Sequence, residues 1–204
     1  MKEKCIFLSA CSDPVDVVFG IPTSQNISVE RFQSMKEFVS QTIDSLDVGP
    51  MKVHVGIVTY GETASTILKM DQLNAKDAVQ TLTNSITQQG NEVNEVSAID
   101  EAFHVTFTIF GGVRQAAPKS FILLVPEGSV NNRQEILAAA RRLKSLGVKL
   151  VTVGVGGGVD SELYKLASSQ PSSKFFYRIP DRGDLRAQSR DVANVVCKGN
   201  LCGV

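Results

Sequence analysis

Residues 15–26 read Val-Asp-Val-Val-Phe-Gly-Ile-Pro-Thr-Ser-Gln-Asn, and the fold can be worked out from this stretch. Val15–Ile21 is an apolar run of strand length rich in β-branched residues, which is typical of a strand buried on both faces. Ser28 then offers a helix N-cap, and apolar residues recur at helical spacing until Gly49-Pro50 ends the segment. The chain therefore begins with a buried strand followed by a helix.

The same alternation of strand and helix continues along the chain. Residues 63–69 follow a tight turn at Gly61-Glu62 and alternate in polarity, as expected of an antiparallel edge strand. Further strands are predicted at 53–60, 121–125, 148–155 and 175–179, and further helices at 75–86, 94–110, 133–146, 160–168 and 184–196. Strands that alternate with helices indicate parallel βαβ units. We predict an α/β fold, a doubly wound and mostly parallel six-stranded sheet with one antiparallel edge strand and helices on both faces, in a Rossmann-like arrangement.

Length and charge limit the domain organisation and the partners. Without an internal repeat or linker, residues 1–204 fit a single domain, with a core at about 13–196 and cysteine-bearing ends at 1–12 and 197–204. Lys plus Arg number 21 and Asp plus Glu number 21, which argues against a nucleic-acid partner. No apolar run reaches the ~20 residues of a membrane helix, so no membrane insertion is expected. Residues 1–10 do not read as a signal peptide, so a secreted chain would be part of a longer, multidomain precursor.

Enzyme chemistry finds little support in the residues. His54 lies inside a predicted strand and His104 in the middle of a predicted helix, whereas ligands in such sheets bind at the carboxyl ends of strands. No G-x-S-x-G nucleophile elbow is present. The Gly154–Gly158 run departs from G-x-G-x-x-G because Val159 takes the last glycine position, so a nucleotide-binding Rossmann enzyme is kept only as an alternative. The loops to inspect for a ligand are those after Ile21, after Tyr60, around Gly90 and after Val125.

All four cysteines lie at the ends of the chain, Cys5 and Cys11 at one end and Cys197 and Cys202 at the other. Neither pair has the C-x-x-C spacing of metal sites and redox motifs, so disulfides are expected. Four cysteines allow three connectivities, and nested pairing would join the two termini. Because disulfides persist in oxidising compartments, we expect an extracellular location.

Four parts of the sequence carry a family resemblance. They are Asp16-Val-Val-Phe-Gly-Ile-Pro-Thr-Ser-Gln-Asn26; Ser45-Leu-Asp-Val-Gly-Pro50 with Val53-His-Val-Gly-Ile-Val-Thr-Tyr-Gly61; Phe121-Ile-Leu-Leu-Val-Pro-Glu-Gly128; and Lys149-Leu-Val-Thr-Val-Gly-Val-Gly156. In order and spacing they resemble the strand signatures of von Willebrand factor A domains. The resemblance is stronger to extracellular matrix members of the family, such as collagen VI chains, matrilins and von Willebrand factor. Some members join their termini by a disulfide, and this similarity favours the pairs Cys11–Cys197 and Cys5–Cys202 here.

The resemblance implies a metal-ion-dependent adhesion site. The family uses D-x-S-x-S after the first strand, a Thr or Ser in a second loop and an Asp after the central strand, which give Mg²⁺ the oxygen ligands it prefers. The matching positions in this chain are Pro22, Ser24, Asn26, Val93 and Glu127. Pro22 and Val93 offer no side-chain oxygen, and Glu127 is one methylene longer than aspartate. We therefore expect a degenerate site with no cofactor, Mg²⁺ being the ion that an intact site would hold.

Two short motifs bear on interactions at the surface. Asn26-Ile27-Ser28 is an N-glycosylation sequon in the loop of the degenerate site, although Ser28 also fits a helix cap. A glycan on Asn26 would cover the old adhesion face. Arg182-Gly183-Asp184 spells the tripeptide that integrins recognise, but Gly183 and Asp184 also fit a turn and a helix N-cap, and this structural role is favoured.

Two non-enzymatic functions follow from the resemblance. The first is a secreted adhesion module of the extracellular matrix that binds a matrix or cell-surface protein without metal, with collagen among the candidate partners. The second is a structural spacer or assembly domain in a multidomain matrix chain. A binder is expected to expose an apolar patch, whereas a spacer has an evenly polar surface. The sequence does not separate these two functions.

Overall fold

The computed structural model describes residues 14–179 and 185–197. Within these residues six strands form one sheet: β1 (Val15–Pro22), β2 (Val53–Tyr60), β3 (Ala64–Leu68), β4 (Lys119–Val125), β5 (Val148–Val155) and β6 (Phe176–Ile179). Their order is β3-β2-β1-β4-β5-β6. β3 runs antiparallel to β2, and the other neighbouring strands are parallel. The predicted doubly wound sheet with one antiparallel edge strand is confirmed.

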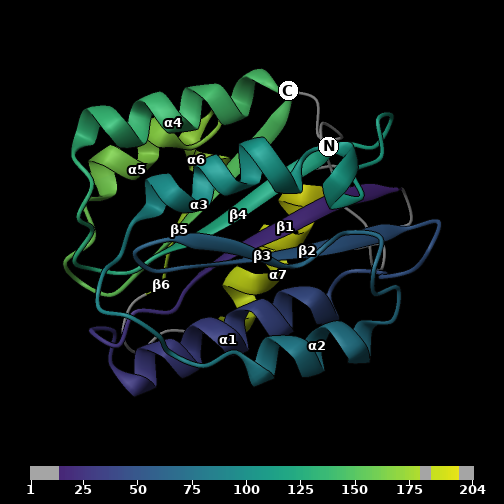
Figure 1. Ribbon diagram of the computed structural model, residues 1–204, viewed down its shortest axis with the longest axis horizontal. Helices are drawn as coiled ribbons and strands as arrows, with labels where there is room; N and C mark the ends of the chain where they lie inside the picture. The colour runs from purple at the N-terminus through teal and green to yellow at the C-terminus, as the bar shows by residue number, and fades with distance from the viewer. Residues whose placement is uncertain (1–13, 180–184, 198–204) are drawn as a thin grey trace, which may run out of the picture.

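Helices cover both faces of this sheet, as predicted. They are α1 (Val29–Asp44), α2 (Lys76–Ser85), α3 (Glu95–Glu101), α4 (Arg133–Ser145), α5 (Ser161–Ala167), the short α6 (Ser172–Phe175) and α7 (Leu185–Cys197). In Figure 1, α1 and α2 lie below the sheet, whereas α3, α4 and α5 lie above it. The apolar side of α7 packs with that of α1, on the same face of the sheet. The molecule is therefore a three-layer sandwich with the sheet in the middle.

The central strand β1 is buried along its whole length because it touches both helical layers. Val17, Phe19 and Ile21 pack in the cluster that contains the apolar faces of α1 and α7. Val18 points the other way, into the cluster formed with α3, α4 and α5. This alternation is the period-two pattern of a strand, and burial on both faces explains why five of the seven residues of the 15–21 run are large and apolar.

Side-chain caps begin the helices that rise from the carboxyl edge of the sheet. Ser28 Oγ accepts a hydrogen bond from the backbone N–H of Arg31 at the start of α1. Asn94 caps α3, and Asn132 forms a capping box with Glu135 at the start of α4. Such caps satisfy backbone donors that lack partners within the helix. The loops of this edge are thus held close to their helices.

The helix predicted at 94–110 is not continuous. It divides into α3, a π-helix η1 (Ala102–Thr106) and a 3₁₀ turn η2 (Ile109–Gly111). The backbone N–H of Phe107 donates to the carbonyl of Ala102, five residues back, and Thr106 Oγ1 lies 2.8 Å from Thr66 Oγ1 on β3. Contacts with the edge strand therefore compete with the α-helical pattern, and apolar periodicity alone did not reveal them. The short helix α6 was not predicted either.

Candidate functional site

The loops selected from the sequence meet at the carboxyl edge of the sheet. The backbone N–H of Thr23 donates to the carbonyl of Tyr60 at 2.7 Å, which links the loop after β1 to the end of β2. Gln25 donates from its backbone to the carbonyl of Gly90 at 2.7 Å, and Asn94 donates to the carbonyl of Gly61 at 3.0 Å. These bonds tie together the loop after β1, the loop after β2 and the segment around Gly90.

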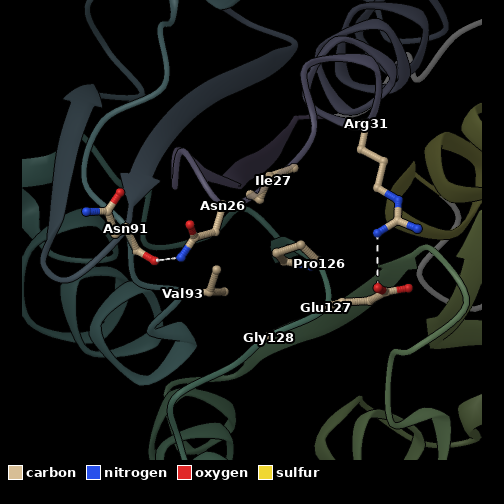
Figure 2. A pocket seen from close by; sticks show the side chains of 8 residues that line it. All are labelled: Asn26, Ile27, Arg31, Asn91, Val93, Pro126, Glu127 and Gly128. Carbon is tan, nitrogen blue, oxygen red and sulfur yellow. Dashed lines mark hydrogen bonds and ion pairs between the residues drawn. The ribbon is translucent and has the colours of Figure 1, made fainter.

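A small pocket opens between these loops (Figure 2). Its volume is about 230 Å³. It is lined by Asn26, Ile27, Arg31, Asn91, Val93, Pro126, Glu127 and Gly128. The lining thus comes from the loop after β1 with the start of α1, from the segment before α3, and from the loop after β4. Because pockets for small molecules typically measure about 300–1,000 Å³, this one has room for a side chain of a partner rather than for a nucleotide.

Three of the five positions matched to the metal site line this pocket, namely Asn26, Val93 and Glu127. Pro22 is the last residue of β1 and is buried. Ser24 is also fully buried, and its Oγ accepts a hydrogen bond from the backbone N–H of Asn26 at 3.2 Å. The structure therefore brings the five positions to one corner of the fold, although Pro22 and Ser24 do not line the pocket.

The amide of Asn26 is used inside the protein. Its Nδ2 donates to the backbone carbonyl of Asn91 at 2.5 Å, across the pocket wall (Figure 2). Val93 is buried, and its carbonyl accepts from the backbone N–H of Val130 in the loop after β4. On this side the pocket is thus closed by hydrogen bonds within the chain and by the apolar side chain of Val93.

On the other side of the pocket, Glu127 is held by a cation and a backbone amide. Arg31 Nη1 lies 3.0 Å from Glu127 Oε2, and both side chains are about one-third exposed. The backbone N–H of Gly158 donates to Glu127 Oε1 at 2.5 Å. This hydrogen bond, followed by the contacts with Arg31, lowers the pKa of the Glu127 carboxyl. Glu127 is therefore a carboxylate that already has protein partners.

The glycine-rich turn after β5 wraps closely around this ion pair. Gly156 has φ +102°, and a Cβ added there would lie 2.8 Å from Glu127 Oε1 and 3.0 Å from Arg31 Cζ. A Cβ at Gly158 would lie 2.9 Å from Glu127 Cδ. The positive φ favours glycine at position 156, and a Cβ at either position would displace the carboxylate or the guanidinium from the ion pair. Gly156 and Gly158 thus pack against a carboxylate, whose negative charge would repel the phosphate of a nucleotide.

These residues do not fit a magnesium site. Mg²⁺ prefers an octahedron of oxygen ligands that includes carboxylates. Pro22 and Val93 supply no side-chain oxygen, and the Glu127 carboxylate is paired with Arg31. The side-chain oxygens of the buried Ser24 and of Asn26 remain, and without an unpaired carboxylate they are too few for such a site. In the part of the chain that the structure describes, no group of three or more His, Cys, Asp or Glu side chains is placed to hold a metal ion.

A buried glutamate below the pocket was missed by the sequence analysis. Glu95, the first residue of α3, is fully buried and accepts hydrogen bonds from Ser129 Oγ at 2.5 Å and from Tyr164 Oη at 3.1 Å. Burial raises its pKa, although both hydroxyls oppose this effect. Glu95 therefore joins α3, the loop after β4 and α5 beneath the candidate site. An acidic residue in the first turn of a helix is common, so its position in the sequence gave little signal.

The structure places the sequon at the start of α1 and both histidines away from the pocket. Asn26 is exposed, and Ser28 of the same sequon serves as the N-cap of α1. His54 Nε2 lies 2.9 Å from the carbonyl of Pro50, near the start of β2, and His104 makes an edge contact with the ring of Phe103. Both histidines thus lie away from the pocket, as expected.

Some predicted sites fall outside the described residues. These are Arg182, Gly183 and Asp184 of the tripeptide, and Cys5, Cys11 and Cys202 of the two terminal disulfides. The integrin motif and the disulfide pairing therefore stay predictions. Within the described ranges, no helix has the length and apolar character needed to cross a membrane.

Comparison with known proteins finds similarity to matrilins and to collagen chains. Human matrilin-1 is 29% identical over 166 residues, which cover 81% of this chain and 33% of that protein. The human collagen alpha-1(XX) chain is 28% identical over 185 residues, which cover 91% of this chain and 14% of that protein. The chain thus spans a third or less of the length of these two curated relatives.

Solved structures share the fold at lower identity. Proximal thread matrix protein 1 from the mussel byssus, in a structure with a zinc-occupied MIDAS motif, has a TM-score of 0.77 and 21% identity, covering 93% of this chain and 47% of that one. Manganese-loaded TRAP protein from Plasmodium vivax has a TM-score of 0.74 and 17% identity, covering 92% and 75%. The family profile described as von Willebrand factor type A domain matches residues 16–190. The chain belongs to the von Willebrand factor type A domain family.

Proposed function

We propose that this chain is a non-enzymatic protein-interaction domain of a secreted extracellular matrix protein, and that it binds its partner without a divalent cation. The observation that carries the metal-independent mode is the pairing of Glu127 with Arg31 and with the backbone of Gly158. The carboxylate that the family would give to the metal is engaged by the protein itself, and two other ligand positions carry no oxygen.

Similarity to matrilins and collagen chains supports the proposed location in the extracellular matrix. Matrilins and collagen chains match most of this chain while exceeding it in length, which supports a single domain within a longer multidomain protein. Cys197 is disulfide-bonded, which supports an oxidising compartment. A matrix or cell-surface protein is the partner class that follows, collagen included.

The surface around the pocket suits a protein partner. Val29 at the start of α1 and Val130 in the loop after β4 are 62% and 54% exposed. Both are close in sequence to residues that line the pocket, and the lining includes Ile27, Val93 and Pro126. Exposed apolar side chains beside a concave surface are typical of protein interfaces. The partner would therefore dock on apolar groups rather than on a metal.

A second candidate function is an assembly domain, and a different surface favours it. Ile109 and Phe110, in the 3₁₀ turn before β4, are 73% and 74% exposed. This turn precedes β4, at the amino edge of the sheet, where the chain also enters β1. An assembly domain would use such an exposed apolar pair to pack against a neighbouring domain. In this case the apolar contact would serve packing between domains.

A solid-phase screen against purified matrix proteins, with Mg²⁺ and with EDTA, tests the proposal. Three proteins are compared: the unchanged chain, Val130→Glu on the candidate face, and Phe110→Glu at the opposite edge as a matched control. We expect binding to a matrix protein that EDTA leaves unchanged, that Val130→Glu abolishes and that Phe110→Glu preserves. Loss of binding in EDTA would contradict the metal-independent mode. Sensitivity to Phe110→Glu alone would favour the assembly domain.

A further inference from the structure

The corner of the fold that corresponds to the family's metal site contains the positive charge of Arg31. Arg31 comes from the first turn of α1, Glu127 from the loop after β4, and Gly156 and Gly158 from the turn after β5. Arg31 and Glu127 face each other at the side of the pocket (Figure 2). Segments that follow three different strands of the sheet therefore converge on one ion pair.

A divalent ion in such a corner would neutralise a carboxylate and hold neighbouring loops together. Arg31 lies against the same carboxylate at 3.0 Å, and the amide of Gly158 binds its second oxygen. The absence of a Cβ at Gly156 lets the backbone approach both the guanidinium and the carboxylate within contact distance. The pair is thus enclosed by backbone on one side, unlike an ion pair between two mobile surface chains.

We infer that the guanidinium of Arg31 is the resident cation of this face and takes the place of the divalent ion at Glu127. This inference rests on the metal-independent binding proposed above and names the residue responsible for it. A covalently attached cation does not dissociate, so the arrangement of the loops is independent of divalent-ion concentration. It also opposes the return of a metal, because a positive charge a few Å away repels a second cation.

The decisive test restores the family ligands with and without Arg31. The restored background carries Pro22→Asp, Asn26→Ser, Val93→Thr and Glu127→Asp. In this background we compare Arg31 itself with Arg31→Ala and Arg31→Lys, and we use Arg133→Ala as the control. Arg133 suits this purpose because it also lies at the start of a helix at this edge and pairs with an acid, Asp160, at 3.8 Å. Mn²⁺ affinity is measured by calorimetry.

If Arg31 is the resident cation, Arg31→Ala binds Mn²⁺ at least about tenfold more tightly than the restored chain with Arg31, because a unit charge close to a divalent ion is removed. Arg31→Lys keeps the charge and stays weak, and Arg133→Ala changes nothing. Equal affinities with Arg31 and with Arg31→Ala would overturn the inference. Mn²⁺ binding by the unchanged chain would instead contradict the proposed metal-independent function, so the two failures are distinguishable.

A second measurement avoids the restored background, in which the buried substitutions at Pro22 and Val93 could impair folding. In the otherwise unchanged chain, amide hydrogen exchange of Gly158 reports whether Glu127 still accepts its N–H. We expect faster exchange in Arg31→Ala, because the carboxylate loses the charge that holds it in place, and near-normal exchange in Arg31→Lys and Arg133→Ala. Unchanged exchange in Arg31→Ala would show that Arg31 does not position Glu127 and would overturn the inference.

Discussion

Replacing Glu95 by glutamine is expected to change how stability depends on pH. Glu95 is fully buried, and burial raises its pKa above that of an exposed glutamate in the unfolded chain. The folded state therefore holds the proton more tightly than the unfolded state. The resulting stabilisation is complete below the unfolded pKa, about 4.3, and is lost as the pH rises through the folded pKa. Glutamine keeps the shape of the side chain but does not titrate.

The expected changes in the free energy of unfolding can be worked out from the pKa shift and the hydrogen bonds of Glu95. Each unit by which the folded pKa is raised corresponds to about 1.4 kcal/mol of stability lost between acidic and neutral pH. Glu95→Ala removes the acceptor of both the Ser129 and the Tyr164 hydroxyls, which costs about 1 kcal/mol each, and leaves a cavity. We therefore expect Glu95→Ala to lower the free energy of unfolding by about 3 kcal/mol. Tyr164→Phe, which removes one of the two hydrogen bonds, is expected to cost about 1 kcal/mol.

Urea unfolding at about pH 5 and about pH 7 measures these differences. Relative to the unchanged chain, Glu95→Gln should gain stability as the pH rises. Glu92→Gln is the matched control, because Glu92 is an exposed glutamate just before α3, and this change should leave the pH dependence unaltered. The reasoning would be refuted if Glu95→Gln and the unchanged chain had parallel pH profiles, or if Glu95→Ala cost less than about 1 kcal/mol.

Three further predictions concern other parts of the chain. Arg114→Ala should lower the free energy of unfolding by about 3–5 kcal/mol in urea titrations, because the fully buried Asp16, 2.7 Å from Arg114 Nη2, would lose its cation; a cost below about 1 kcal/mol would speak against this role. Protein secreted from eukaryotic cells should carry a glycan on the exposed Asn26, and an intact mass equal to that of the bare chain would end this proposal. Non-reducing peptide mapping should recover the two predicted terminal disulfides, whereas a bridge within one terminus would contradict the pairing.

The sheet could be predicted from the sequence because its strands are buried on both faces. In a chain of alternating strands and helices, short continuous apolar runs such as 15–21 and 121–125 indicate buried strands. Of the four loops chosen for a ligand site, those after Ile21, Tyr60 and Val125 follow from topology, since the carboxyl ends of parallel strands meet at one edge. Three of the four loops supply the residues that line the pocket.

The chemistry of the site could not be predicted in the same way. The pairing of Arg31 with Glu127 joins residues far apart in the sequence, and nothing local to either residue indicates its partner. Glu95 stands at the start of a helix, where an acid is ordinary, and its burial depends on Ser129 and Tyr164 from later segments. The break of the helix at Thr106 likewise depends on contacts with β3. Each of these features is long-range, whereas periodicity and motifs report local structure.

Thermal unfolding with Mg²⁺, with Mn²⁺ and with EDTA tests the metal-independent face most directly. A site filled at about one hundred times its dissociation constant would add about 2.7 kcal/mol of stability, which for a domain of this size corresponds to a rise of roughly 5–10 °C in Tm. With Arg31 holding Glu127, the three melting curves are expected to coincide. A rise of several degrees with either ion, reversed by EDTA, would contradict the account.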